Sequence, residues 1–326
     1  MREKNNKIIY ALNLRNYLLS TMKGKTSKAG SWNDVPHDIL VKIFMTLNIM
    51  DLITSVSRVC SSWRRASCDP ALWEKLDLST MKSSSVNIPR EPYAWSDKES
   101  GDKLLLIMKN AMSLGGGHAV CLILHFYAFL RNEHLLCAAE RSPKLKKLAL
   151  PAWNQLNVDA FEEAVKHWKA LETLTVPCVY SPVNILRAIG THCKNFSRLK
   201  IMCPFDLEFA NAIITYIPKL KVLSLRCAMV YKDALSCIMN ALHHLEVLNL
   251  NHCLLVDDAQ YEGFVVVYRE HEQEIIEKGS RFKTFLFCNQ ATCAMCQHTF
   301  DDEGILRWYE YDEILWRTDE VSSLAL

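Results

Sequence analysis

The sequence contains no apolar run of the 18 or more residues that a membrane-spanning helix requires. It also has little net charge, because 38 Lys and Arg residues stand against 36 Asp and Glu residues, a formal charge of +2. There is therefore no global electrostatic case for binding nucleic acid or an anionic membrane surface. Hydrophobic residues make up 50% of the 326 residues, which is ordinary for a globular protein with a sizeable core.

Recognisable catalytic motifs are missing as well. The glycine run at residues 115–117 lacks the Lys-Ser/Thr pair that follows in a phosphate-binding loop. No G-x-S-x-G nucleophile elbow and no H-E-x-x-H zinc helix occur. With 13 Cys and 11 His in the chain, a Cys/His pair could be assembled by chance and is uninformative. We therefore expect no catalytic residue, and a binding protein rather than an enzyme.

Cysteine is abundant, but its distribution argues against a disulfide framework. Cys121, Cys137 and Cys237 are typical in lying within apolar runs, in a chain too large to need covalent staples. No secretory signal is recognised before them. We therefore expect reduced thiols and a cytoplasmic or nuclear location.

Acidic residues are nearly absent from residues 1–31, where Glu3 is the single acid among seven Lys and Arg residues. Such a basic segment is found in organelle-targeting presequences, in short amphipathic helices and in loosely ordered extensions. We predict a disordered extension and leave targeting open.

Residues 32–75 predict a small unit of three helices. Apolar side chains recur at helical spacing through residues 39–47 and 52–59, and Asp51 is a candidate N-cap for the second helix. Trp73 adds a large apolar side chain where the chain leaves the third helix. About 40 residues bury only a small core, so some of this apolar surface should contact another surface.

The order and spacing of these residues resemble the F-box. The pattern of that family is Leu-Pro, an acidic residue, an aliphatic pair, Ile-Phe, Leu, Asp-Leu, Val-Cys, Trp-Arg and a closing Leu-Trp. Val35 stands where the family usually has Leu, a conservative change. The chain matches the pattern at Pro36, Asp38, Ile39, Leu40, Ile43, Phe44, Leu47, Asp51, Leu52, Val59, Cys60, Trp63, Arg64, Leu72 and Trp73.

A second pattern, L-x-x-L-x-L, recurs along the rest of the chain. From Leu122 to Leu248 its middle residues are 24 to 26 positions apart, within the leucine-rich-repeat window of about 20 to 29 residues. Segments of helical periodicity lie between these short strands, so each unit must stack on its neighbours to bury its apolar face. The middle residues are Leu76, Leu122, Leu148, Leu174, Leu199, Leu223, Leu248 and Phe285.

The predicted fold is α/β, with a three-helix F-box at residues 32–75 and a leucine-rich-repeat solenoid at 76–287. We expect an open arc of about eight strands, with the parallel sheet on the concave face and the helices on the convex face. Insertions near 80–102 and 266–281 are either tolerated surface loops or binding segments. Residues 288–326 should cap the last repeat, and their aromatic tail could alternatively form a partner-binding helix.

Cations gather on the expected concave strip of the array. This basic strip would suit an acidic or phosphorylated segment of a protein substrate. Alternatively, exposed strand positions are polar only for solubility. The candidate substrate-binding residues are Lys146, Lys147, Arg198, Lys200, Lys221 and Arg226.

Four potential metal ligands follow the last strand. Cys288, Cys293, Cys296 and His298 read C-x4-C-x2-C-x-H, and zinc favours such thiolate and imidazole ligands. The full spacing fits no zinc module known to us, and 13 cysteines make close pairs expected. The sequence therefore favours a cap on the last repeat, and we expect no metal and no cofactor.

As a whole the chain resembles plant F-box/LRR proteins. The resemblance implies that the F-box docks on a Skp-type adaptor of a cullin ubiquitin ligase, while the repeats hold a protein substrate. It implies no membrane or nucleic-acid partner. A non-degradative adaptor-bound scaffold would show the same sequence. Matched by position, the adaptor-binding residues are Pro36, Ile39, Leu40, Ile43, Leu52 and Trp63.

Overall fold

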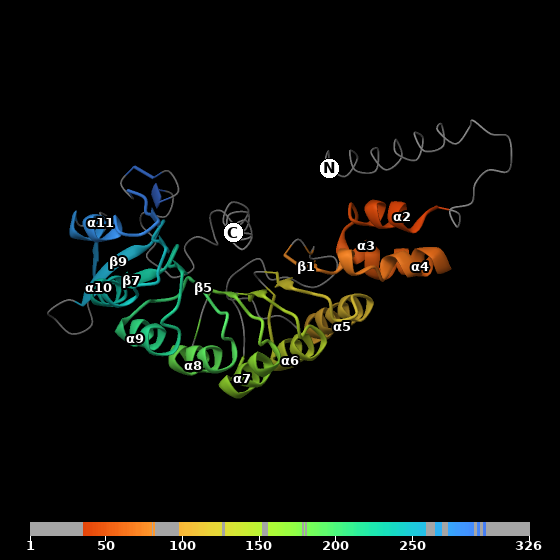
Figure 1. Cartoon of the computed structure of the whole chain (residues 1–326), viewed down its shortest axis with the longest axis horizontal. Coiled ribbons are helices and arrows are strands. Elements are labelled where there is room, and N and C mark those ends of the chain that lie inside the picture. The colour runs from red at the N-terminus through yellow and green to blue at the C-terminus, as the bar shows by residue number, and fades with distance from the viewer. Residues whose placement is uncertain are drawn as a thin grey trace.

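The computed structural model describes residues 35–79, 81, 98–125, 128–151, 156–177, 179, 181–258, 265–268, 273–289, 292–293 and 296–297. Figure 1 shows helices at one end of an arc whose inner side is lined by strands and whose outer side is lined by helices. The expected extension at 1–31 and most of the expected cap at 288–326 lie outside the described residues, as do residues 82–97 of the first insertion.

The N-terminal unit is built from short helices joined by tight turns. Asn48 caps the second of them by accepting a hydrogen bond from the backbone N–H of Asp51, so the expectation that Asp51 itself is the cap was wrong. Asp51 lies instead in the first turn, where a carboxylate favours the helix dipole. The elements are α2 (His37–Phe44), α3 (Ile49–Thr54), η3 (Val56–Arg58), α4 (Ser61–Ser67) and η4 (Pro70–Leu72).

A parallel sheet of eight strands runs through the array, in the order β1-β2-β3-β4-β5-β6-β8-β11. The middle residue of each L-x-x-L-x-L pattern pairs with the middle residue of the next, from Leu76 through to Phe285, which confirms the repeat alignment. The strands are β1 (Lys75–Asp77), β2 (Cys121–Ile123), β3 (Lys147–Ala149), β4 (Thr173–Val176), β5 (Arg198–Ile201), β6 (Val222–Ser224), β8 (Val247–Asn249) and β11 (Thr284–Leu286).

The helices of the array pack side by side on the outer side of the sheet. Asn157 and Asp206 cap two of them by accepting hydrogen bonds from backbone N–H groups. None of the described helices is long and apolar enough to cross a bilayer. Their bounds are α5 (Lys98–Leu114), α6 (Asn132–Arg141), α7 (Val158–His167), α8 (Pro182–His192), α9 (Leu207–Tyr216) and α10 (Lys232–Ala241).

A second, three-stranded sheet was not anticipated from the sequence. β7 (Met229–Tyr231) pairs in parallel with β9 (Leu254–Asp258), and β9 pairs antiparallel with β10 (Val265–Tyr268). The insertion expected near 266–281 begins with part of strand β10, and α11 (Gln273–Gly279) lies in its second half.

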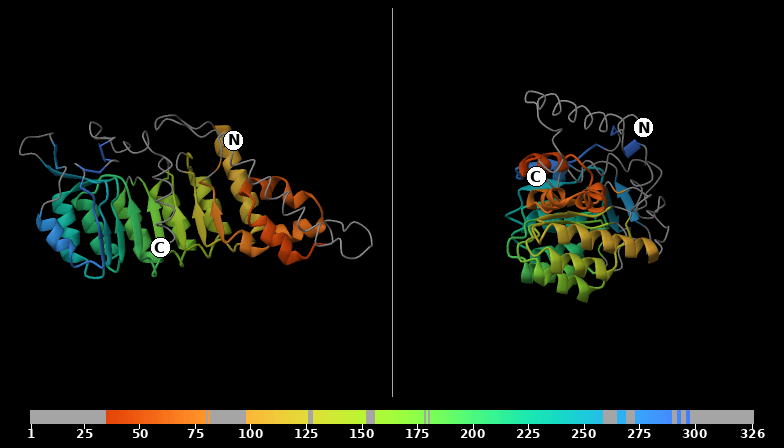
Figure 2. Two further views of the ribbon diagram at one scale, coloured as in Figure 1. Left: turned by 90° about the horizontal axis from the view of Figure 1, so that it is seen from above. Right: turned by 90° about the vertical axis from the view of Figure 1, so that its right-hand side faces the viewer.

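The N-terminal unit and the array share one continuous hydrophobic core. Trp73 is wholly buried, and its indole N–H donates to the carbonyl oxygen of Ser67 at 2.6 Å. Two residues later the chain enters β1, and α3 packs against α5. Figure 2 shows the N-terminal helices directly against the first helix of the arc. The unit is therefore held in a fixed orientation to the sheet.

Candidate functional site

One side of α2 carries apolar residues that the core leaves partly uncovered. Leu40, Val41 and Phe44 are buried beneath it. Ile39 and Ile43 are half-buried and Pro36 is exposed, and their spacing places all three in one row along the helix. This α2 row, Pro36-Ile39-Ile43, is an apolar surface that a partner could cover.

The other expected adaptor-binding residues lie deeper. Leu40 and Leu52 belong to the hydrophobic core, so they support the unit from inside. Trp63 on α4 is half-buried and sets its ring edge-on against Phe44, with the ring centroids 5.2 Å apart. The six candidates therefore divide into core residues and residues that reach the surface.

The six cations of the basic strip also divide. Lys146 and Lys221 are exposed, while Lys147 and Arg198 are half-buried. Lys200 and Arg226 are only 7% and 4% exposed, which differs from the expectation of an open row along the strip. Four of the six side chains are therefore accessible to an incoming partner in this conformation.

Two exposed cations of the strip face glutamates on the next repeat. The ammonium of Lys146 lies 3.2 Å from Glu172, and that of Lys221 lies 3.7 Å from Glu246. These pairs are solvent-exposed, so each contributes little to stability. They do reduce the excess of positive charge. The charge of the strip is consequently more mixed in sign than the sequence predicts.

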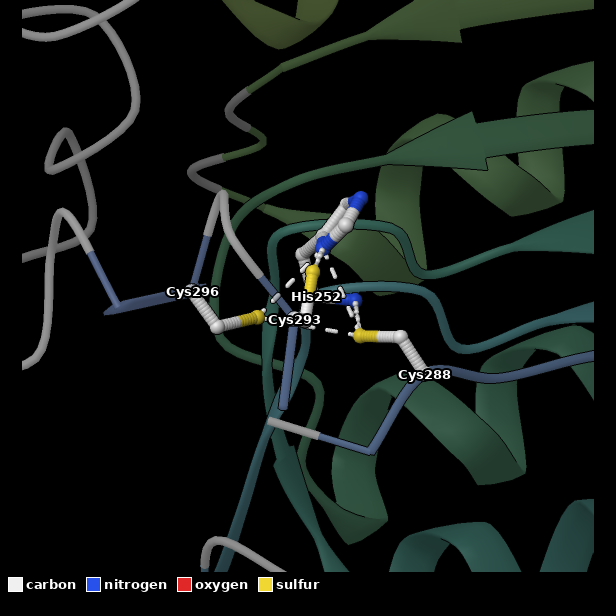
Figure 3. Close-up of side chains that lie close together, drawn as sticks. All are labelled: His252, Cys288, Cys293 and Cys296. Carbon is white, nitrogen blue, oxygen red and sulfur yellow. Dashed lines mark hydrogen bonds between the residues drawn. The ribbon is translucent and has the colours of Figure 1, made fainter. Parts of the chain in front are cut away.

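At the far end of the array, three cysteines surround one histidine. Figure 3 shows the sulfur atoms of Cys288, Cys293 and Cys296 gathered around the imidazole of His252. The Nδ1 atom of His252 lies 3.3, 3.5 and 3.4 Å from those sulfur atoms, in that order. Cys296 is buried, and His252, Cys288 and Cys293 are half-buried. We call these four residues the histidine–cysteine cluster.

Hydrogen bonding within the histidine–cysteine cluster favours a thiolate. The bond with the Cys296 thiol lowers the pKa of Cys288 to about 4, against the opposing effect of burial, and the His252 contacts act in the same direction. The same bond and burial raise the pKa of Cys296. The hydrogen bond therefore favours the thiolate form of Cys288 and the protonated form of Cys296.

The sequence reading anticipated three members of this cluster and missed the fourth. It paired the cysteines with His298, which lies outside the described residues, whereas the structure supplies His252 from the turn between β8 and β9. His252 precedes Cys288 by 36 positions. The repeat pattern offered one signal for His252, because consecutive repeats place β8 and β11 side by side in the sheet. That pairing brings the ends of the two strands together.

Comparisons with known proteins point to one family. Residues 32–79 match the F-box-like family model. The chain is 45% identical to an F-box/LRR-repeat protein of Arabidopsis thaliana over 300 residues, which cover 90% of this chain and 96% of the relative. It is 28% identical to the F-box protein SKIP19 of the same plant, over 74% of this chain and 76% of that protein.

A solved structure of a Bacteroides fragilis protein aligns with 60% of this chain and 63% of its own length. The TM-score is 0.38 and the identity 11%, values too low to support an argument.

Proposed function

This chain belongs to the F-box/LRR-repeat proteins, and from that membership we propose that it is the substrate-recognition subunit of an SCF-type ubiquitin ligase. In this role the N-terminal unit binds a Skp-type adaptor and, through it, a cullin. The repeats bind a protein substrate. The chain would supply no chemistry, and reduced thiols suit a place in the cytoplasm or nucleus.

The observation that carries the proposal is the α2 row. Pro36, Ile39 and Ile43 offer a partner an apolar surface on a unit too small to bury it alone. Trp63 lies half-exposed on the neighbouring helix and adds aromatic area of the kind enriched in protein interfaces. Leu40 and Leu52 would act indirectly, by holding α2 and α3 in place.

Rigid attachment of the unit to the array supports the same role. Ubiquitin transfer to a bound substrate is accelerated by holding the acceptor lysine close to the charged conjugating enzyme, which is an effective-concentration effect. A substrate held on an arc that cannot swing relative to the adaptor keeps that distance. The shared core around Trp73 is the feature that would transmit this geometry.

The adaptor contact can be tested by placing charge on the α2 row. We expect Ile39→Asp combined with Ile43→Asp to abolish co-purification with a Skp-type adaptor, because two carboxylates would be buried without partners. Met45→Asp is the matched control, since Met45 ends the same helix, is 55% exposed and lies outside the row. Adaptor binding that survives the double change while thermal unfolding is normal would refute the proposal.

Leu40→Ala would be a poor test of the same contact. Leu40 is 1% exposed, so its truncation should cost about 2 to 5 kcal/mol of stability whether or not it touches an adaptor. Loss of binding in that variant would therefore report unfolding of the unit. Thermal unfolding measured beside co-purification separates the two causes.

Substrate binding is assigned to the accessible part of the basic strip, namely Lys146, Lys147, Arg198 and Lys221. Proximity labelling from the full chain, with the proteasome inhibited, identifies candidate substrates. We expect charge reversal of Lys147 and Arg198 to weaken the capture of an acidic substrate, because within the described residues neither has the glutamate contact that Lys146 and Lys221 make. A captured client that is never ubiquitinated in a reconstituted reaction would favour the non-degradative scaffold instead.

A further inference from the structure

The histidine–cysteine cluster joins parts of the chain that are distant in sequence. His252 lies in the turn that follows β8, and Cys288 comes two residues after the end of β11. Cys293 and Cys296 follow on the same segment as Cys288 and return toward the turn. The cluster therefore connects the turn after β8 to the chain leaving β11, the last strand of the eight-stranded sheet.

Four of the distances within the cluster match those of a tetrahedral zinc site. Zinc binds sulfur at about 2.3 Å and histidine nitrogen at about 2.0 to 2.1 Å, so two sulfur ligands of a tetrahedron lie about 3.8 Å apart, and a nitrogen and a sulfur about 3.5 Å apart. The sulfur atoms of Cys288 and Cys296 are 3.7 Å apart, and the three nitrogen-to-sulfur distances are 3.3, 3.5 and 3.4 Å. All four ligand atoms lie within 4.8 Å of one another.

The ligand types narrow the choice of metal. Thiolates and an imidazole suit zinc, whereas calcium and magnesium take oxygen ligands. An iron–sulfur cluster has its cysteines on several iron atoms, which needs a wider ligand set than four atoms within 4.8 Å. A disulfide would require a sulfur separation of about 2.05 Å, and the 3.7 Å between Cys288 and Cys296 is nearly twice that.

Backbone groups prepare the cluster for a cation. The N–H of His252 donates to the sulfur of Cys288 at 3.2 Å, a bond that supports a thiolate ligand. His252 takes a left-handed backbone conformation with φ 60°, unusual for a residue other than glycine, which turns both its N–H and its ring toward the sulfurs. The carbonyl of Asn289 accepts the N–H groups of Thr292 and Cys293, and that turn brings Cys293 back to the imidazole.

From this geometry we propose that His252, Cys288, Cys293 and Cys296 bind one structural Zn²⁺ ion that fastens the C-terminal end of the repeat array. The sequence alone favoured a simple cap, and the contribution of His252 changes that preference. Four protein ligands fill a tetrahedral zinc ion, so no position remains for a catalytic water.

A metal has a clear structural task at this end of the array. In β11, Thr284 and Leu286 are exposed and Phe285 is half-buried, whereas the middle strands bury nearly every side chain. Little apolar burial therefore holds the last strand against β8. Zinc binding free energy becomes folding free energy when the site exists only in the folded chain, so the ion would stabilise the pairing of β11 with β8.

The test uses the full chain, purified under reducing conditions without chelator. We expect about one zinc per chain by plasma mass spectrometry. After removal of the metal, the protein should take up Co²⁺ and show the visible absorption of tetrahedral cobalt with thiolate-to-metal charge transfer. This measurement requires no variant to fold. Wild-type protein that binds neither stoichiometric Zn²⁺ nor Co²⁺ with that spectrum would overturn the proposal.

Variants then identify the ligands. Losing a group that only orients a metal ligand typically weakens metal binding by about 10- to 100-fold. Cys293→Ser removes a ligand itself, so it should weaken Zn²⁺ binding by more than that. Cys237→Ser is the matched control, because Cys237 is another half-buried thiol in the C-terminal half but lies outside the cluster. His252→Cys should retain the ion, since four thiolates also bind zinc, whereas His252→Ala should release it. Equal zinc loss in Cys237→Ser and Cys293→Ser, with normal far-ultraviolet circular dichroism in both, would contradict this ligand set.

Discussion

A Cβ atom built on Gly115 would lie 2.7 Å from the Cβ of Trp73. Gly115 directly follows α5, and Trp73 is the buried residue through which the N-terminal unit enters the array. The contact joins the two parts of the molecule at their shared core. It also explains why residue 115, the first of the glycine run, is a glycine. From the sequence alone, the run could only be ruled out as a phosphate-binding loop.

Replacing Gly115 should therefore loosen this junction. Gly115→Ala forces a methyl group against a part of Trp73 that cannot rotate away, and we expect a loss of about 1 to 3 kcal/mol in the free energy of unfolding. Urea unfolding measures it. Gly101→Ala is the control, because the nearest atoms there belong to the movable guanidinium of Arg131. Equal stability of the two variants would show that the Trp73 contact does not constrain the junction.

Gly190 allows two neighbouring helices of the array, α8 and α9, to approach each other closely. A Cβ on this residue of α8 would lie 2.2 Å from the carbonyl oxygen of Tyr216 at the end of α9. A backbone oxygen cannot move without shifting its helix. Overpacking typically costs about 1 to 3 kcal/mol, so Gly190→Ala should lower the free energy of unfolding by about 3 kcal/mol or more. A urea midpoint within error of wild type would disprove it.

His134 should make stability depend on pH. Burial lowers the pKa of its imidazole, despite the bond from its Nε2 to the carbonyl of Gly101. The folded state therefore binds fewer protons than the unfolded state. Stability is complete above the unfolded pKa of about 6.5 and falls as pH drops from there toward the folded pKa, by up to roughly 1.4 kcal/mol per pH unit.

Unfolding free energies measured at pH 7.5 and 5.5 check this expectation. His134→Gln should reduce the difference between the two values, because it removes the buried titrating ring. His243→Gln should leave the difference unchanged, because His243 is exposed. The idea fails if the two variants show the same pH dependence.

Cys193 should be inert in the folded protein. Burial raises the pKa of its thiol to about 12, and the thiol donates a hydrogen bond to the carbonyl of Trp168 at 3.3 Å. Because the thiolate is the reactive form, iodoacetamide at pH 8 should modify exposed Cys68 in the native chain and Cys193 only after denaturation. Peptide mass spectrometry distinguishes the sites. Similar native labelling rates for the two cysteines would contradict the burial of Cys193.

The sequence by itself determined the repeat register and the type of most elements. Leu148, Leu174 and Leu199 recur at a spacing that leaves one strand and one helix per unit, and stacking is the only way for such units to bury their apolar faces. The F-box-like pattern was equally local, because its apolar residues repeat at helical spacing. Features that depend on local residue spacing can therefore be predicted from the sequence.

Only the tertiary structure decided how distant residues meet. The burial of Lys200 and Arg226, the contact of Gly115 with Trp73 and the second sheet all depend on the stacking of whole repeats. His252 joins the three cysteines for the same reason, since parallel strands β8 and β11 bring their ends together across 36 residues of chain. A linear motif search has no access to that neighbourhood, because it exists only after the sheet has formed.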